Sequence, residues 1–124
     1  MRYLKLFESF DKENLSIKLA KKGDEFKIFD LLLNGDKIGE IALEGDSTMT
    51  IIDSTIDEEY RGRGYYKQFL FQIVRRYNIK INSVFRSPEA DRAWSSFVGK
   101  LPIDIKYKVY KDMDGNKNYE ISLK

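Results

Sequence analysis

The sequence contains no cysteine and no histidine, and only two of its 124 residues are proline. Without cysteine, disulfide bonds and thiol catalysis are excluded, and the redox compartment is not indicated. Without histidine, the most common metal ligand and the most common base at neutral pH are absent. A metal site would therefore need carboxylates alone, and acid–base chemistry falls to Asp, Glu, Tyr, Lys, Ser or water.

Long apolar runs are also missing, because no stretch approaches the ~18 residues that a membrane-spanning helix needs. The N-terminal stretch MRYLKLFESF is too short and too mixed for a secretory signal. The hydrophobic content of 42% and the aromatic content of 14% exclude a disordered chain. We therefore expect one folded domain over residues 1–124, in the cytoplasm.

The net charge of +2 hides an asymmetry between the two halves of the chain. Residues 1–60 carry 8 Lys and Arg against 14 Asp and Glu, a formal charge of −6, whereas residues 61–124 carry 14 against 6, a charge of +8. A basic half can receive a phosphate-rich ligand. Ordinary surface charge produces the same pattern.

The first half of the chain has the alternating apolar pattern of strands separated by turn residues. Ahead of these strands, apolar residues at helical spacing between Tyr3 and Phe10 predict a short amphipathic helix. Asn34-Gly35-Asp36 is a strong hairpin signal. We expect an antiparallel meander of four strands: Leu15–Leu19, Phe26–Leu33, Ile38–Leu43 and Thr48–Ile56.

The second half begins with the clearest helix of the chain, from Tyr66 to Tyr77, with apolar residues at i, i+3, i+4, i+7 and i+8. A strand over Ile79–Phe85 follows, and a connection through a helix makes it parallel to the fourth strand. Ser87 and Pro88 begin a second helix that Gly99 ends. Ile103–Tyr110 and Asn118–Leu123 close the chain as a hairpin.

This order predicts an α+β fold, with a mixed, mostly antiparallel sheet of six to seven strands, two main helices and a short N-terminal helix. The loop Arg61-Gly62-Arg63-Gly64 lies between the fourth strand and the main helix. Glycines let a backbone approach a ligand closely, and the N–H groups of a helix N-terminus favour anions. The loop therefore suits a pyrophosphate. A plain turn with solvated arginines is the alternative.

The stretch Ile56-Asp57-Glu58-Glu59-Tyr60-Arg61-Gly62-Arg63-Gly64-Tyr65-Tyr66-Lys67-Gln68-Phe69-Leu70 resembles the acetyl-CoA loop of the GNAT superfamily of N-acyltransferases, V-x-P-x-Y-R-G-K-G-I-G-x-x-L-L. Ser87-Pro88-Glu89-Ala90 and Trp94 are similar to a second motif of that family, N-P-x-A-x-x-x-Y. The order of strands and helices from Leu15 to the C-terminus also resembles the family's. The resemblance implies a GNAT-like fold.

The resemblance further implies acetyl-CoA as cofactor and the transfer of an acetyl group to a primary amine by direct attack. Ser54, Thr55 and Ile56 would pair by backbone with the pantetheine arm. Backbone N–H groups from Gly62 to Tyr66 would hold the pyrophosphate, supported by two arginines. The cofactor-binding residues implied are Ser54, Thr55, Ile56, Arg61, Gly62, Arg63, Gly64, Tyr65, Tyr66 and Ser87.

Two positions depart from the family pattern. Tyr66 stands where the family has Gly or Ala, and Trp94 stands where many members have the Tyr that protonates the leaving thiolate. Since Trp cannot supply that proton, we expect Ser96, its neighbour Ser95, Tyr65 or water to do so. Asp53 matches a position where some members carry a carboxylate, and we expect it to act as the general base, a solvent-facing strand residue being the alternative.

Family members usually carry two helices between the first two strands, which wall the acceptor site, whereas here only Lys21–Asp24 separates them. An open site favours a macromolecular acceptor, such as a protein lysine or N-terminus. Leu6-Phe7-Glu8 resembles the leaders of proteins packaged in the heads of tailed phages, which would place the protein in a virion or an infected host cell. Residues 1–12 are then a leader, or else a docking helix of the domain.

Three functions remain open from the sequence. The first is an acetyl-CoA-dependent N-acetyltransferase. The second is a GNAT-fold protein without catalysis that serves as a binding or structural module, encoded by a phage. The third, a nucleic-acid binder that uses the basic half, is disfavoured because most aromatic residues follow core periodicity.

Overall fold

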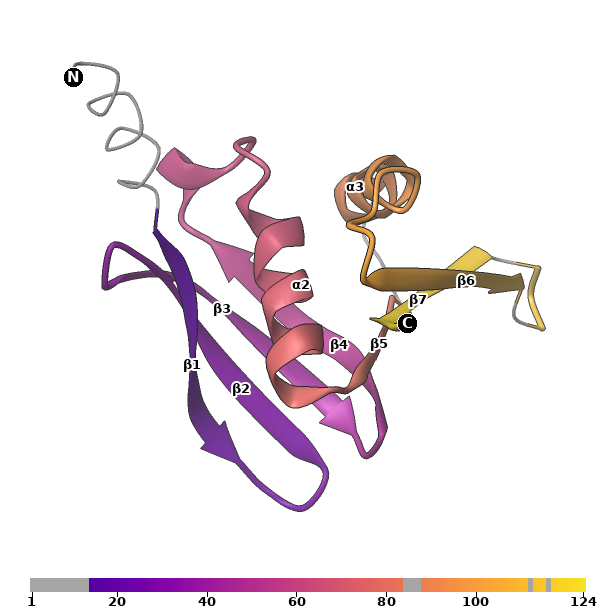
Figure 1. The fold of residues 1–124 in the computed structure, drawn as a ribbon, viewed down its shortest axis with the longest axis horizontal. Helices are drawn as coiled ribbons and strands as arrows, with labels where there is room; N and C mark the ends of the chain where they lie inside the picture. Colours follow the sequence, from indigo (N-terminus) through magenta and orange to yellow (C-terminus); the bar gives the residue numbers. More distant parts are fainter. Residues whose placement is uncertain (1–13, 84–87, 112, 116) are drawn as a thin grey trace.

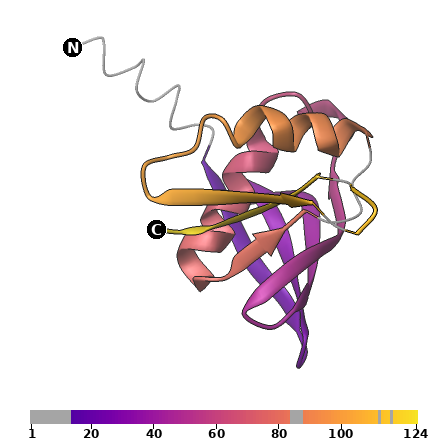
Figure 2. The ribbon, with the colours of Figure 1, turned by 90° about the vertical axis from the view of Figure 1, so that its right-hand side faces the viewer.

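The computed structural model describes residues 14–83, 88–111, 113–115 and 117–124, and seven strands form one sheet in the order β1-β2-β3-β4-β5-β7-β6. Figure 1 shows α2 lying across β1–β4 and α3 lying beside the β6–β7 hairpin, and Figure 2 shows α3 from the side. The elements are β1 (Leu15–Lys22), β2 (Phe26–Leu33), β3 (Asp36–Gly45), β4 (Thr48–Ile56), the 3₁₀ helix η1 (Glu58–Tyr60), α2 (Tyr65–Tyr77), β5 (Lys80–Asn82), α3 (Pro88–Phe97), β6 (Ile105–Lys111) and β7 (Lys117–Leu123).

Strands β1–β4 form the antiparallel meander that the alternating pattern predicts. The turn between β2 and β3 contains Asn34 and Gly35, with φ angles of 53° and 88°. These are the two residue types that adopt the left-handed turn conformation most easily, so the sequence specifies this hairpin locally. The connection from β1 to β2 is a turn at Gly23, whose N–H donates to the carbonyl of Phe26 at 3.0 Å.

Helix α2 buries its apolar stripe against the meander. Its side chains Phe69, Leu70, Ile73 and Val74 are fully buried. The helix ends at Asn78, which has φ of 49° and donates its N–H to the carbonyl of Val74 at 2.9 Å. An asparagine in the left-handed conformation is a common helix stop, as the sequence predicts. The helix packs on buried residues of the strands, among them Ile17, Phe29, Leu31, Ile41, Leu43 and Met49.

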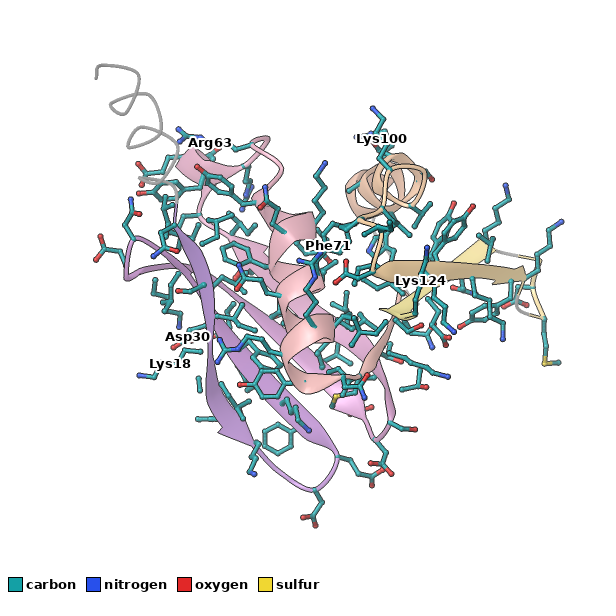
Figure 3. All side chains as sticks on the ribbon, viewed as in Figure 1. Lys18, Asp30, Arg63, Phe71, Lys100 and Lys124 are labelled. Atoms are coloured by element: carbon teal, nitrogen blue, oxygen red, sulfur yellow. The ribbon has the colours of Figure 1, made fainter. Side chains whose placement is uncertain are left out.

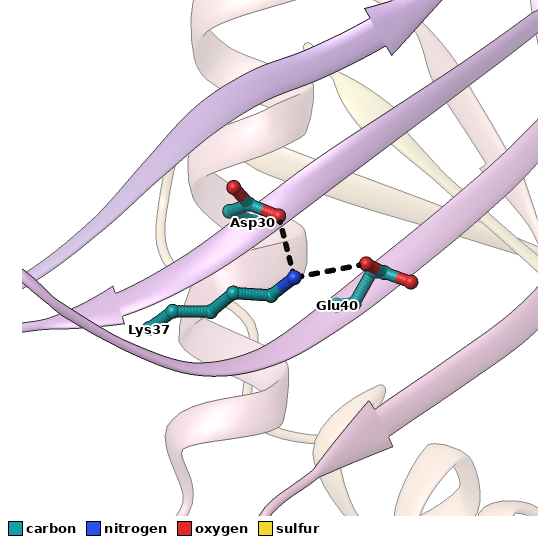
Figure 4. Close-up of polar contacts among 3 residues, drawn as sticks. All are labelled: Asp30, Lys37 and Glu40. Carbon is teal, nitrogen blue, oxygen red and sulfur yellow. Dashed lines mark hydrogen bonds and ion pairs between the residues drawn. The ribbon is translucent and has the colours of Figure 1, made fainter.

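The opposite face of the meander carries charged side chains. Asp30 lies between the buried residues Phe29 and Leu31, so its side chain points to the other face. There Lys37 lies 3.2 Å from Asp30 and 3.1 Å from Glu40. Figure 4 shows these three side chains in front of the strands, with α2 behind them.

The sheet divides beyond the first residues of β4. Strand β4 pairs with β5 in parallel only from Thr48 to Thr50, whereas it pairs with β3 up to Ile56. Strand β5 then pairs with β7 through Ile81 and Asn82, and β7 pairs along its length with β6. Figure 1 shows β4 diverging from the β5–β7–β6 group. Within the described residues, the edge of β4 from residue 51 to 56 has no strand partner on the β5 side.

The α+β class, the mixed sheet and the two main helices are confirmed. Strand bounds differ by a few residues, and β5 is shorter than the predicted Ile79–Phe85, because only Lys80–Asn82 pair as a strand among the described residues. The predicted N-terminal helix and the leader over residues 1–12 lie outside the described residues, as does Ser87. Of the helices that the structure describes, none is long and apolar enough to cross a membrane.

Candidate coenzyme A site

A pocket of about 310 Å³ lies where β4 ends and α2 begins. It is lined mainly by apolar atoms, and one α3 residue, Ala93, contributes to its wall. The lining residues are Ser54, Thr55, Ile56, Tyr60, Arg61, Gly62, Gly64, Tyr65, Tyr66 and Ala93. Three elements that lie apart in the sequence therefore meet at this pocket.

The end of β4 is shaped by a β-bulge. Ala42 pairs with Asp53 and Leu43 pairs with Ile51, so that Ile52 is an extra residue on β4. Ile52 is 56% exposed. Bulges bend a strand and locally end its pairing, which helps to separate β4 from β5. Beyond the bulge, Ser54 pairs with the buried Ile41 and therefore faces the α2 side of the sheet.

The loop that follows β4 is held by its own backbone and by Arg61. The Nε atom of Arg61 donates a hydrogen bond of 2.7 Å to the carbonyl oxygen of Ile56. Gly62 and Gly64 have φ angles of 77° and 79°, in the region that favours glycine. This geometry turns the chain sharply from the strand into the helix.

Gly64 precedes α2 and has no side chain with which to cap the helix. The first turn of α2 contains no acidic residue. Backbone N–H groups at a helix start lack helical partners and carry a partial positive charge. The end of the pocket at Gly62 and Gly64 is therefore suited to an anion, with Arg61 as an additional charge.

Tyr66 enters the pocket from the first turn of α2. Its hydroxyl interacts with Ser54 on β4 and with Trp94 on α3. Burial raises the pKa of the Tyr66 hydroxyl above its ordinary value of 10.0, and the hydrogen bonds from Ser54 and Trp94 partly oppose this shift. Trp94 itself is 1% exposed and stacks on Tyr119 of β7, with ring centroids 6.2 Å apart.

The structure brings together eight of the ten predicted cofactor-binding residues, all of which line the pocket. Arg63 does not line it; its guanidinium carbon lies 5.7 Å from the ring centroid of Tyr60. In Figure 3, Arg63 lies at the end of the loop away from α3. Ser87 falls outside the described residues.

The two predicted catalytic residues do not line the pocket. Ser96 is an exposed residue of α3. Asp53 pairs with Ala42, two positions along from the pair of Glu40 and Thr55, so its side chain lies on the charged face, opposite Ser54. Asp53 is exposed there.

Tyr60 and Ala93 line the pocket but are not predicted from the sequence. Tyr60 belongs to the loop motif itself and ends the short helix η1. Ala93 follows the apolar stripe of α3, and a small residue on such a stripe gives no signal of its own. Ala93 lines the pocket because α3 packs across it.

No protein-family model matches the sequence, and the chain has no match among curated proteins. Solved structures do match its fold. An acetyltransferase from Thermus thermophilus has a TM-score of 0.57 at 16% identity, over 82% of this chain and 66% of its own, slightly less than two thirds of its length.

A GNAT family acetyltransferase from Elizabethkingia anophelis, with acetyl-CoA bound, has a TM-score of 0.55 at 12% identity, over 91% of this chain and 100% of its own. An aminoglycoside acetyltransferase in complex with coenzyme A and kanamycin has a TM-score of 0.53 at 17% identity, over 82% of this chain and 68% of its own. These similarities show that the chain has the GNAT acetyltransferase fold.

Proposed function

We propose that this protein transfers the acetyl group of acetyl-CoA to a primary amine by direct attack. The observation that carries the proposal is the pocket at the end of β4, which joins a glycine-rich helix start to a strand edge that has no strand partner among the described residues. This combination suits a ligand in which a chain of amide groups ends in a pyrophosphate. Two solved structures of the same fold hold acetyl-CoA or coenzyme A.

Each part of the pocket has a role in holding the coenzyme. The open edge of Ser54–Ile56 offers backbone N–H and C=O groups to the amides of the pantetheine arm, as an added strand would. Backbone N–H groups from Gly62 to Tyr66 meet the pyrophosphate, because the helix dipole and the positive φ angles favour an anion there. Arg61 contributes its remaining N–H donors. When bound, the coenzyme supplies an acetyl group activated as a thioester.

The amine would reach the opening between β4 and β5 from the charged face. This face carries Asp53 at the bulge, and an exposed carboxylate can take a proton from an approaching ammonium group, directly or through water. The β1–β2 connection is only a tight turn, so no helix from that connection encloses this side. We therefore propose an acceptor that needs no enclosed site, such as a lysine or N-terminus of a protein, with Asp53 as the base.

The experiment is a calorimetric titration of the protein with acetyl-CoA, followed by an assay of thiol release with a panel of peptides and small amines. Acetyl-CoA at 100 times its Kd should stabilise the fold by about 2.7 kcal/mol. Ala93→Phe fills the pocket and should weaken binding at least about tenfold, since the ligand would lose buried contact area. Ala20→Phe, at an exposed position of β1, is the matched control.

Absence of heat and of a thermal shift at millimolar acetyl-CoA would contradict the proposal. Binding without transfer to any amine would favour the second candidate, a GNAT-fold binding module without catalysis. That candidate has a specific observation behind it: the side chain of Tyr66 lines the pocket at a position where the GNAT loop has Gly or Ala.

A further inference from the structure

The two outer strands of the sheet differ in how their free edges are covered. Strand β1 forms one edge, and two of its carbonyl oxygens accept hydrogen bonds from α2. Nε2 of Gln72 donates to the carbonyl of Leu15 at 2.7 Å, and Nη1 of Arg76 donates to that of Ile17 at 3.3 Å. Strand β6 forms the other edge, and within the described ranges no side chain makes a comparable bond to its backbone. The outward backbone groups of β6 are therefore open to another strand.

The side chains of β6 divide by face into lysines and apolar groups. Tyr107 and Val109 lie on the α3 face of the sheet, because Val109 pairs with Tyr119, whose ring stacks on a side chain of α3. They are 50% and 43% exposed there. Lys106 and Lys108 alternate with them, so both lie on the opposite face, and both are exposed. A segment added to this edge would meet a charged row on one face and an apolar row on the other.

The charge of this edge is not neutralised by the neighbouring strand. Strand β6 contains three lysines and no acidic residue. Lys108 pairs in register with Glu120 of β7, yet no ion pair joins them, and Lys106 forms none with any described residue. Acidic side chains on an added strand, placed opposite these lysines, would gain cross-strand charge pairs. Apolar side chains of the same strand would cover the exposed apolar row.

A second copy of the chain fits this edge poorly. If β6 pairs antiparallel with β6 of another copy about an axis at Lys106, Tyr107 or Lys108, a lysine of one copy lies opposite a lysine of the other. Strand β1 of another copy is no better suited, since it carries three lysines of its own. Like charges directly opposite each other in a sheet are destabilising. Lysines on an edge strand prevent such self-pairing, and they leave the edge selective for a partner of opposite charge.

We propose that the free edge of β6 is a docking site for an extended peptide segment of another protein, in which acidic residues alternate with apolar ones. The segment adds a strand beyond β6, and its backbone groups pair with those of β6. Its acidic side chains lie opposite Lys106 and Lys108, and its apolar side chains cover Tyr107 and Val109. The inference does not depend on the proposed acetyl transfer, because no residue of β6 lines the coenzyme pocket.

The first test uses a peptide with blocked ends in which glutamate and valine alternate over 7 residues, the length of β6. The control is a peptide of the same composition with the glutamates grouped ahead of the valines. Titration followed by calorimetry should show that the alternating peptide binds at least about fivefold more tightly, because it alone presents each row to the matching face. Equal Kd values for the two peptides, or no binding at millimolar alternating peptide, would overturn the proposal.

The second test changes the lysines of the edge. Lys106→Glu combined with Lys108→Glu should weaken the alternating peptide at least about fivefold, since it replaces two opposite-charge pairs by like charges. Lys18→Glu combined with Lys22→Glu, at exposed positions of β1, changes the net charge equally and should alter Kd by less than about twofold. Equal losses in the two double variants would show that only net charge matters and would overturn the proposal. If the reversal lowers stability next to Glu120, Lys106→Gln with Lys108→Gln replaces it.

Hydrogen exchange of backbone amides locates the bound peptide. Saturating alternating peptide should slow the exchange of the outward amides of β6 and leave β1 unchanged. Slowed exchange confined to other strands would overturn the proposal. So would a wild-type dimer that protects β6 at the protein concentration of the titration, which would assign the edge to a second copy. A single-stranded oligonucleotide that binds β6 more tightly than the peptide would assign the edge to nucleic acid and would overturn the proposal as well.

Discussion

The Nε atom of Arg61 lies 2.7 Å from the carbonyl oxygen of Ile56, the last residue of β4. This bond closes the loop between the strand and α2, and Arg61 also lines the pocket. Arg63, two residues later, lies over the ring of Tyr60 instead. Two arginines of one motif thus have different roles.

This difference predicts unequal effects of two alanine substitutions on coenzyme binding. Arg61→Ala should raise the Kd for acetyl-CoA by about tenfold or more, since it removes a charged donor from the pocket and loosens the loop. Arg63→Ala should raise the Kd by about twofold at most, because exposed charges contribute little. Calorimetry at fixed ionic strength measures both, and a larger effect of Arg63→Ala would contradict the placement of the arginines.

We expect a substitution of Gly62 to lower stability through backbone strain alone. A Cβ atom at this position would meet nothing within 4 Å, but its φ angle is 77°. Gly62→Ala should therefore cost about 1–2 kcal/mol in the free energy of unfolding, which is the penalty of the left-handed conformation for an ordinary residue. Gly62→Asn should cost less. Urea denaturation measures these changes, and Gly99→Ala, which has neither a positive φ nor a tight contact, serves as the control.

We expect a substitution of Gly39 to lower stability through a steric clash near the end of β4. A Cβ atom on Gly39 would lie 2.2 Å from the carbonyl oxygen of Thr55, so β3 and β4 would have to separate. Gly39→Ala should lower the free energy of unfolding by about 1–3 kcal/mol or more. Because Thr55 and Ile56 line the pocket, it should also weaken acetyl-CoA binding. If urea denaturation shows the same stability for Gly39→Ala and the wild type, the prediction is wrong, because the strands would then separate at little cost in free energy.

Tyr66 predicts a specific loss of stability at alkaline pH. Its pKa in the folded state lies above the ordinary value of 10.0, mainly because the side chain is buried. The folded state thus holds the proton more tightly than the unfolded state, and stability falls as pH rises between the two pKa values. The contribution is complete below pH 10.0 and is lost as the pH rises through the folded pKa.

Urea denaturation between pH 9 and pH 11 measures this effect. The wild type should lose more stability over this range than Tyr66→Phe, which has no ionisable hydroxyl. Parallel curves for the wild type and Tyr66→Phe would mean that the Tyr66 phenol ionises as easily in the folded state as in the unfolded one.

The sequence predicted those parts of the fold that local physics specifies. Asn34 and Gly35 suit the left-handed turn that they adopt, and the apolar stripe from Phe69 to Val74 has the period of the helix that it forms. The glycine-rich loop was recognisable because glycine permits the positive φ angles that Gly62 and Gly64 adopt. The resemblance to the GNAT loop implied the eight predicted residues that line the pocket.

The features that the sequence did not predict depend on contacts between distant elements. The partners of Tyr66 lie on β4 and α3, and no periodicity indicates that a tyrosine at a helix start will bridge them. The parallel pairing of β4 with β5 covers only Thr48 to Thr50 of β4, and the β-propensity of these residues does not indicate where it stops. Ala93 becomes a wall residue because α3 packs across the pocket.

The open edge of β4 bears on how the protein avoids self-association. An unpaired strand edge usually invites another sheet to add to it, which can lead to aggregation. The described part of β4 from residue 51 to 56 leaves about 20 Å of such edge without a strand partner toward β5. It lies inside the angle between two diverging parts of one sheet, where a broad sheet from another molecule cannot approach and a single extended chain can. The divergence of the two parts of the sheet therefore exposes the backbone groups of β4 and also limits their partners to segments as narrow as one extended chain.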